Sequence, residues 1–315
     1  MTKYILKRLL IAIPVLIGIT IVDYLIMSLA GSPLDMMRGP RVSQAALDAR
    51  AIQLGLDQPW FMQYFVWLRQ LMRGNLGYSI RGHEAVLAMI GRSIGPTLLL
   101  MGTSLAITLL IAIPVGIYSA VHQYSVGDYA AVTLSFVGSS IPGFFLALVL
   151  IYVFTIRLGW LPSSDMVTRG TEGGTLDLIR HMVMPVTVLV FSSVGSNIRY
   201  IRSAVLEILQ QDYMRTARAK GIGRFLVIYK HGLRNALLPI VTVIGMQIPT
   251  LFGGAVIVEQ VFAWPGLGLM TMSAILQRDY PVIMGIALLS AVVVLAANLL
   301  TDVLYAVVNP AITYE

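Results

Sequence analysis

The sequence contains no cysteine and little charge. Charged residues make up 12% of its 315 residues, hydrophobic residues make up 57%, and the mean hydropathy is +0.81. A water-soluble fold of this length could not bury so much apolar surface, so the composition excludes an ordinary soluble domain and predicts a membrane protein. Because cysteine is absent, the sequence gives no indication of the redox compartment.

Enzyme motifs are missing as well. None of the lysines follows a glycine, so the chain lacks a Gly-Lys-Ser/Thr phosphate loop and is not expected to hydrolyse ATP by itself. His83-Glu84 has Leu87 where a metalloprotease would place its second histidine. Residues 102–106 weakly match a nucleophile elbow, but they lie in an apolar segment without a histidine partner, where small residues favour close helix packing. We therefore expect no catalytic residue, no metal site and no cofactor.

Long apolar segments predict about six membrane-spanning helices. Each is close to the roughly 20 residues that cross the hydrocarbon core. Prolines inside them, such as Pro14, Pro114 and Pro142, can be accommodated by neighbouring helices. The predicted spans are residues 7–30, 96–121, 129–156, 181–203, 236–262 and 283–308.

Lysine and arginine are unevenly distributed between the two sides of these spans. The first side holds Lys3, Lys7, Arg8, Arg199, Arg202, Arg215, Arg218, Lys220, Arg224, Lys230 and Arg234. The short loops on the second side hold Arg157, Arg169, Arg180 and Arg278. The positive-inside bias therefore predicts that both termini and the segment 199–235 are cytoplasmic. The net charge of +7 then reflects topology, and because no loop joins basic and aromatic residues in one platform, we expect no nucleic-acid partner.

Two segments between the spans have patterns of their own. Residues 31–95 are too polar to span, yet one helical face within them is apolar and consists of Trp60, Tyr64, Trp67, Leu68 and Leu71. Asp57 is a candidate helix cap ahead of Pro59. Residues 261–268 contain so much proline and glycine that the fifth helix must end there, with Trp264 suited to the membrane interface. We expect a helical lid in the first segment and a turn in the second.

Three acids fall within the predicted spans, namely Asp23, Glu259 and Asp302. Acids at membrane depth are candidates for a functional role. Glu259 lies near the outer end of the fifth span and Asp302 near the inner end of the sixth, where water or a partner reaches them. This placement favours hydrogen bonding between helices over a proton relay.

The basic segment after the fourth span has a pattern that charge alone does not require. Ala217 and Ala219 lie among good helix formers, and Gly221 is suited to end the helix in a left-handed conformation. A short helix with small residues on one side could enter a cleft on another protein, whereas an ordinary positive-inside loop needs no such pattern. The residues of this candidate docking segment are Asp212, Tyr213, Arg215, Thr216, Ala217, Arg218, Ala219, Lys220 and Gly221.

The segments 215–221 and 231–239 resemble, nearly residue for residue, the cytoplasmic coupling loop of ABC-importer permeases of the peptide/nickel branch. Arg215-Thr216-Ala217 replaces the generic Glu-Ala-Ala, as in that branch. The resemblance extends over the chain, most specifically at 54–79 and 259–310. Residues 5–20 also match the family's retained first helix, although Lys3, Lys7, Arg8 and the following apolar run would by themselves suit a cleaved signal peptide.

The resemblance implies an all-α integral membrane protein with six transmembrane helices in the type I importer permease fold. It divides the chain into an N-terminal helix at 1–30, an extracytoplasmic helical insertion at 31–95, and a core permease domain at 96–310 with the coupling loop at 204–235. The insertion is then a lid over the outer mouth, a docking surface for a binding protein, or both. Its candidates for the outer gate or pathway are Glu259, Trp264, Pro265 and Gly266.

The implied partners are a homologous permease, two cytoplasmic ATPase subunits that bind ATP and Mg²⁺, an extracytoplasmic substrate-binding protein and the lipids of a bacterial cytoplasmic membrane. Di- or oligopeptides are the implied substrates, and nickel, glutathione or another small solute is the alternative within the branch. A stand-alone secondary transporter would be expected to have inverted repeats with broken helices around ionisable groups, and the two halves of this sequence show no such similarity. An intramembrane enzyme lacks a nucleophile and a base.

Overall fold

In the computed structural model, every regular element among the described residues is a helix; the only β contact there is an isolated antiparallel bridge between Tyr78 and Ala85, and turns and loops join the helices. The described residues are 2–29, 31–32, 34, 43–170, 173–221, 223, 226, 245, 247, 251 and 255–308. Their elements are α1 (Thr2–Leu29), α2 (Gln44–Leu54), α3 (Trp60–Leu71), α4 (Val86–Val121), α5 (Val126–Ser140), α6 (Gly143–Leu150), the π-helical turns η2 (Ile151–Arg157), α7 (Thr175–Leu209), α8 (Asp212–Ala219), α11 (Val256–Val261), α12 (Leu267–Leu276) and α13 (Tyr280–Val308).

Helices α1, α4, α7 and α13 are long and apolar enough to cross a membrane. They confirm the first, second, fourth and sixth predicted spans and the all-α integral membrane fold. Helix α4 starts at Val86, so its first turns lie within the range 31–95 that the sequence assigns to the insertion. Most of the fifth predicted span, 236–262, lies outside the described residues, and its last turns form α11.

The third predicted span, 129–156, is wrong as a single straight helix. Helix α5 ends at Ser140, and the pair formed by α5 and the α6–η2 segment is bent by 89°. Pro142 explains the break, because it has no backbone N–H to continue α5 and it forces Ile141 into an extended conformation (φ −85°, ψ 121°). The hydroxyl of Ser140 also donates to the carbonyl of Phe136 and so competes with the helical ladder at the same point.

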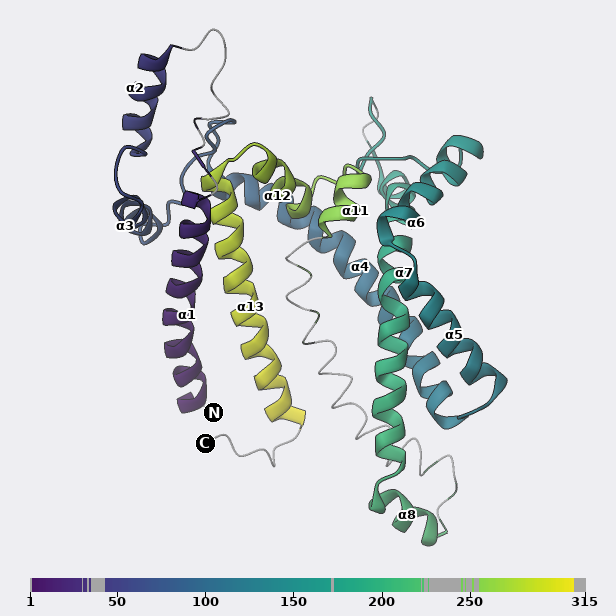
Figure 1. The fold of residues 1–315 in the computed structure, drawn as a ribbon. Helices are drawn as coiled ribbons and strands as arrows, with labels where there is room; N and C mark the ends of the chain where they lie inside the picture. The colour runs from purple at the N-terminus through teal and green to yellow at the C-terminus, as the bar shows by residue number, and fades with distance from the viewer. Residues whose placement is uncertain are drawn as a thin grey trace.

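Helix α7 is the centre of the packing, with α4 and α5 against it (Figure 1). Glycines allow these close approaches: a Cβ at Gly195 would lie 2.5 Å from the carbonyl oxygen of Ser135, and one at Gly116 would lie 2.9 Å from Ile201. Helices α1 and α13 run side by side on the other side of the molecule, and α4 crosses between the two groups (Figure 1). The start of α1, the end of α13 and α8 all lie at the same end of the bundle (Figure 1).

Candidate functional site

Helix α8 forms a short foot below the end of α7 (Figure 1). Its first turn closes on the carbonyl of Gln211, which accepts from the backbone N–H of Met214 at 3.0 Å. Gly221 follows the helix with φ +72°, so the predicted left-handed end is confirmed. A side chain with a Cβ is strained at this φ, although the space around Gly221 is open.

The side chains of α8 divide into two faces. Met214 and Ala217 are buried and pack against Leu209 at the end of α7. Ala217 therefore faces α7, because α8 folds back on α7 and the residues three apart along it meet Leu209. The exposed residues are Asp212, Tyr213, Arg215, Thr216, Ala219, Lys220 and Gly221, and the side chain of Arg218 lies outside the described residues.

The exposed face is polar, and the contacts described here for its side chains lie within α8. Arg215 Nη1 lies 3.8 Å from Asp212 Oδ1, and both side chains are largely exposed, so this pair contributes little stability. The Thr216 hydroxyl donates to the carbonyl of Asp212 at 3.0 Å. The arrangement presents Tyr213, Thr216 and Lys220 along one side of the helix at a spacing of three to four residues, which suits docking into a groove.

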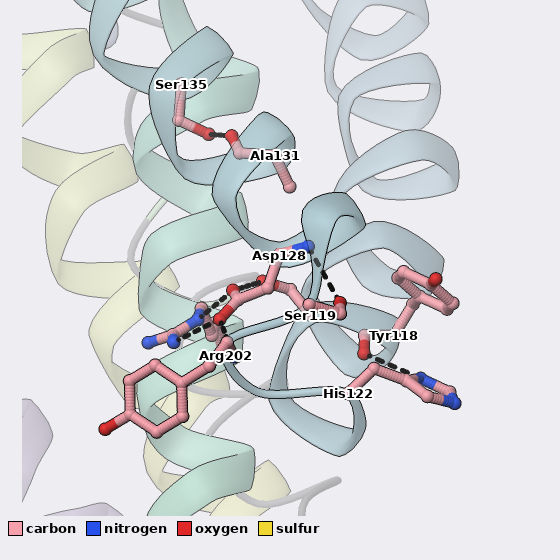
Figure 2. A network of polar contacts seen from close by, with 9 residues as sticks. Tyr118, Ser119, His122, Asp128, Ala131, Ser135 and Arg202 are labelled. Carbon is pink, nitrogen blue, oxygen red and sulfur yellow. Dashed lines mark hydrogen bonds and ion pairs between the residues drawn. The ribbon is translucent and has the colours of Figure 1, made fainter.

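A buried ionic pair holds the helix above α8. Arg202 of α7 binds Asp128 of α5 in a bidentate arrangement, with Nε to Oδ1 at 2.7 Å and Nη2 to Oδ2 at 2.8 Å (Figure 2). The Asp128 carboxylate also accepts from the backbone N–H of Tyr124 at 2.9 Å and from the hydroxyl of Ser119. Its charge is thus matched by one guanidinium and further hydrogen-bond donors, which is the condition under which a buried ion pair is tolerated.

This pair connects three helices near the foot. Ser119 belongs to α4, Asp128 to the first turn of α5 and Arg202 to α7, and Ser125 caps α5 by accepting from the Asp128 N–H at 3.2 Å (Figure 2). The sequence reading missed this contact, because it counted Arg202 only as a topological charge. The available signal was an acid three residues after a Ser cap at the start of a predicted apolar helix. Its partner, 74 residues away, has no local signature.

Three of the predicted gate residues, Glu259, Trp264 and Gly266, form a compact cluster at the opposite end, whereas Pro265 is exposed. Glu259 is fully buried; its Oε1 accepts from the Thr97 hydroxyl at 2.9 Å, and its Oε2 accepts from the Leu269 N–H at 3.0 Å. Thr97 in turn accepts from the Leu267 N–H at 2.7 Å. Glu259 and Thr97 therefore satisfy the first backbone N–H groups of α12, where Gly266 provides no side-chain cap.

Trp264 completes this cluster. It is fully buried, and its indole Nε1 donates to the carbonyl of Pro96 in α4 at 3.0 Å. A Cβ at Gly266 would lie 2.4 Å from both Glu259 Oε2 and Thr97 Oγ1, so only glycine fits this approach. The cluster fastens α11 and α12 to α4, as expected for inter-helix hydrogen bonding. A part in the pathway for Glu259, Trp264, Pro265 and Gly266 stays a prediction.

Of the other acids in the spans, the side chain of Asp302 lies outside the described residues, and Asp23 is partly exposed on α1. Asp57 does not cap α3, because Pro59 occupies the cap position without a side-chain hydrogen bond and Asp57 instead accepts from the Gln58 side chain. Neutral polar groups link the middle of the bundle: Gln247 donates to Asn197 Oδ1 at 2.9 Å. The sequence reading had assigned no role to these two residues.

Comparisons with known proteins support the reading of the fold. Residues 112–314 match the family described as binding-protein-dependent transport system inner membrane component, and residues 1–101 match its N-terminal companion. The chain is 45% identical to the oligopeptide transport system permease protein AppB of Bacillus subtilis, with 100% of both chains covered. It is 47% identical to a putative peptide permease protein of Brucella ovis, with 99% of both covered. The glutathione transport system permease protein GsiC of Escherichia coli O6:H1 is 38% identical over 100% of both chains.

A solved structure shares the fold. It contains the methionine ABC transporter MetNI in an inward-facing conformation; the aligned chain has a TM-score of 0.56 and 19% identity, and the match covers 71% of this chain and 97% of that one. The family match covers well over half of the sequence, and the relatives cover nearly all of it. The chain therefore belongs to the family of inner membrane components of binding-protein-dependent transport systems, as a membrane-spanning, non-catalytic permease subunit of an ABC importer.

Proposed function

We propose that this chain and a homologous permease subunit together form the pathway by which an ATP-driven importer takes up di- or oligopeptides. Two cytoplasmic ATPase subunits bind ATP and Mg²⁺, and an extracytoplasmic binding protein delivers the peptide. The full-length relatives named as oligopeptide and peptide permeases support this substrate class. The glutathione permease at 38% identity supports a related small solute as the second candidate.

The observation that carries the mechanism is α8, a short helix with an exposed polar face fixed to the end of the best-packed helix of the bundle. We assign its exposed side, with Tyr213, Thr216 and Lys220, to the ATPase groove. ATP-driven closure of the ATPases then displaces α8 and α7 together. Because Arg202 binds Asp128, the displacement reaches the α4–α5 connection, and the pathway alternates between its two openings.

The docking surface is tested by Thr216→Trp, which adds bulk on the exposed side of α8. We expect the amount of ATPase subunit that co-purifies in mild detergent to fall about tenfold or more, with membrane insertion unchanged. Ser203→Trp is the matched control, because Ser203 is exposed on α7, outside α8 and outside the coupling loop 204–235, and should retain the ATPases. Full retention of the ATPases by Thr216→Trp would remove α8 as the docking surface.

The proposed orientation places α8 and both termini in the cytoplasm. Arg169 precedes α7 and Lys220 follows α8, so the two exposed residues lie at opposite ends of a helix of roughly 50 Å. The chain has no cysteine, so Arg169→Cys and Lys220→Cys each introduce a single reactive thiol. An impermeant maleimide should label position 169 and not 220 in intact cells; the opposite pattern would reverse the topology.

The substrate class is tested by competition in cells that express the complete importer. Uptake of a labelled tripeptide should be suppressed by excess unlabelled tripeptide and little affected by a nickel chelate. Glutathione separates the two peptide-like candidates, because it should compete strongly only if it is the physiological solute. Uptake of the nickel chelate without uptake of peptide would preserve the importer architecture and refute the peptide assignment.

A further inference from the structure

The level at which helix α3 contacts α1 indicates where α3 lies in the bilayer. The apolar run of α1 extends from Leu10 to Leu29, and its 20 residues correspond to about 30 Å, the thickness of the hydrocarbon core. The hydroxyls of Tyr64 and Thr20 are hydrogen-bonded at 3.0 Å, and the Tyr24 hydroxyl donates to Gln63 Oε1 at 3.2 Å. Tyr24 and Thr20 precede Leu29 by about 8 and 14 Å along the helix. Helix α3 is therefore fixed below the end of the apolar run, inside one leaflet.

The orientation of α3 agrees with this depth. In Figure 1, α3 is seen end-on beside the upper part of α1, whereas α1 runs along the plane of the picture, so the two axes cross. The aromatic ring of Tyr64 packs edge-on against Tyr24 with centroids 5.7 Å apart, and this contact stabilises the crossing of the two helices. A helix that lies across the span at this level is positioned as an interfacial helix.

The exposed residues of α3 are mostly apolar. Phe61 and Phe65 lie outside the lining of the cavity described below, whereas Trp60, Met62 and Val66 line it. Phe65 has 62% of its surface exposed, although the same helix turn places Tyr64 in a buried contact. Exposed aromatic and apolar residues that continue the apolar surface of α1 are suited to lipid and unsuited to water.

A cavity of about 920 Å³ lies between α3, the last turns of α1 and the first turn of α13. Among the residues that the structure describes, its lining contains no aspartate, glutamate, lysine or arginine. Toward the end of α1 it is lined by Ser32, Gln58 and His83. Deeper along α1 and α13 it is lined by Met27 and Met284, and by Tyr24 and Gln63, which are hydrogen-bonded to each other. The cavity is thus polar at its mouth, and its deeper part combines apolar side chains with one hydrogen-bonded polar pair.

We propose that α3 lies in the leaflet that surrounds the end of α1, and that the cavity behind α3 binds a membrane lipid with an acyl chain inside and the headgroup at its mouth. The proposal needs only that α1 spans the membrane, so it does not depend on the substrate or on the ATPase contact. A protein partner from the aqueous side would have to displace lipid to reach α3. Any docking surface for a binding protein in 31–95 then falls on parts of that range other than α3.

The depth of α3 is tested with a fluorophore on single cysteines in nanodiscs, whose two faces are both open to solvent. Phe65→Cys should be quenched several-fold more strongly by lipids that carry a nitroxide near the top of the acyl chain than by aqueous iodide. Asp48→Cys on α2, which Figure 1 places beyond the end of α1, should show the reverse. Equal quenching of both positions by iodide would overturn the proposal.

The lipid site is tested with phosphatidylethanolamine that carries a photoreactive group in its acyl chain. Cross-links should map to residues 60–67 and 280–284 of the wild-type chain. Ser28→Trp fills the cavity and should reduce these cross-links at least several-fold, whereas Ile26→Trp, on an exposed part of α1 outside the lining, should not. Met27→Phe is a second, milder cavity-filling variant in case Ser28→Trp fails to fold. Cross-links that are absent from these residues, or unchanged in the filled variants, would refute the site.

Discussion

At the scale of single residues, the molecule relies on a few polar groups whose partners are far away in the sequence. Asp128 and Arg202 hold α5 on α7, and Glu259 holds the start of α12. Sequence reasoning identified Glu259 as a candidate because an acid in a span is unusual. It overlooked Asp128, because the residue lies at a helix start, where an acid is common and its distant partner is invisible.

The Asp128–Arg202 pair leads to a prediction about stability. Replacing Asp128 by leucine leaves a guanidinium without its partner in a largely buried position, which should cost about 3–5 kcal/mol. The double replacement Asp128→Leu with Arg202→Leu removes both charges and should cost clearly less than the single one. Thermal unfolding in detergent measures both. A double variant that is less stable than Asp128→Leu would contradict this account of the pair.

Gly266 leads to a second residue-scale prediction. A methyl group there would overlap Glu259 and Thr97, so Gly266→Ala should lower stability by about 1–3 kcal/mol through overpacking. Gly102→Ala is the matched control, because a Cβ at Gly102 meets nothing within 4 Å. The two variants are compared by thermal unfolding in the same detergent. Equal stability of the two variants would mean that the cluster around Glu259 accommodates the added methyl group without strain, which would contradict this prediction.

At the scale of elements, local sequence patterns predicted where helices form better than where they break and which side chains they bury. The left-handed end at Gly221 followed from residue type alone, because few other residues adopt that φ. The break before Pro142 did not follow, because proline is also tolerated within straight membrane helices, and Pro14, Pro114 and Pro185 lie inside α1, α4 and α7. The inward direction of Ala217 could not be predicted either, since it depends on how α8 folds back onto Leu209.

The broken third span gives a prediction at this scale. Phe136 and Val149 are exposed on either side of the 89° bend. With spin labels at these positions, the backbone separation should be about 13 Å, whereas a straight helix would place them about 20 Å apart. Pro142→Ala restores a backbone N–H and should shift the distance toward the longer value. If dipolar broadening gave the longer distance for the labelled protein that retains Pro142, the result would contradict the bend.

At the scale of the whole molecule, the chain combines a membrane bundle with a foot at one end and a closed polar cluster at the other. Composition and hydropathy were sufficient to predict a membrane protein, and the pattern of the coupling segment was sufficient to predict the importer family. How the two ends are connected was not predictable, because it depends on helix packing. Helix α7 carries α8 at one end, contacts α5 through Arg202 and Gly195, and contacts α4 through Ile201. A force on α8 therefore acts on a connected group of helices.

The central claim is that this chain transports only as part of an ATP-driven assembly. The most direct test reconstitutes the purified chain in vesicles, first alone and then with its homologous permease, two ATPase subunits and the binding protein, and follows entry of a labelled tripeptide. The chain alone should be inactive, and the complete assembly should transport peptide with ATP but not with a non-hydrolysable analogue. Peptide uptake by the chain alone under an imposed proton gradient would contradict the claim and indicate a secondary transporter.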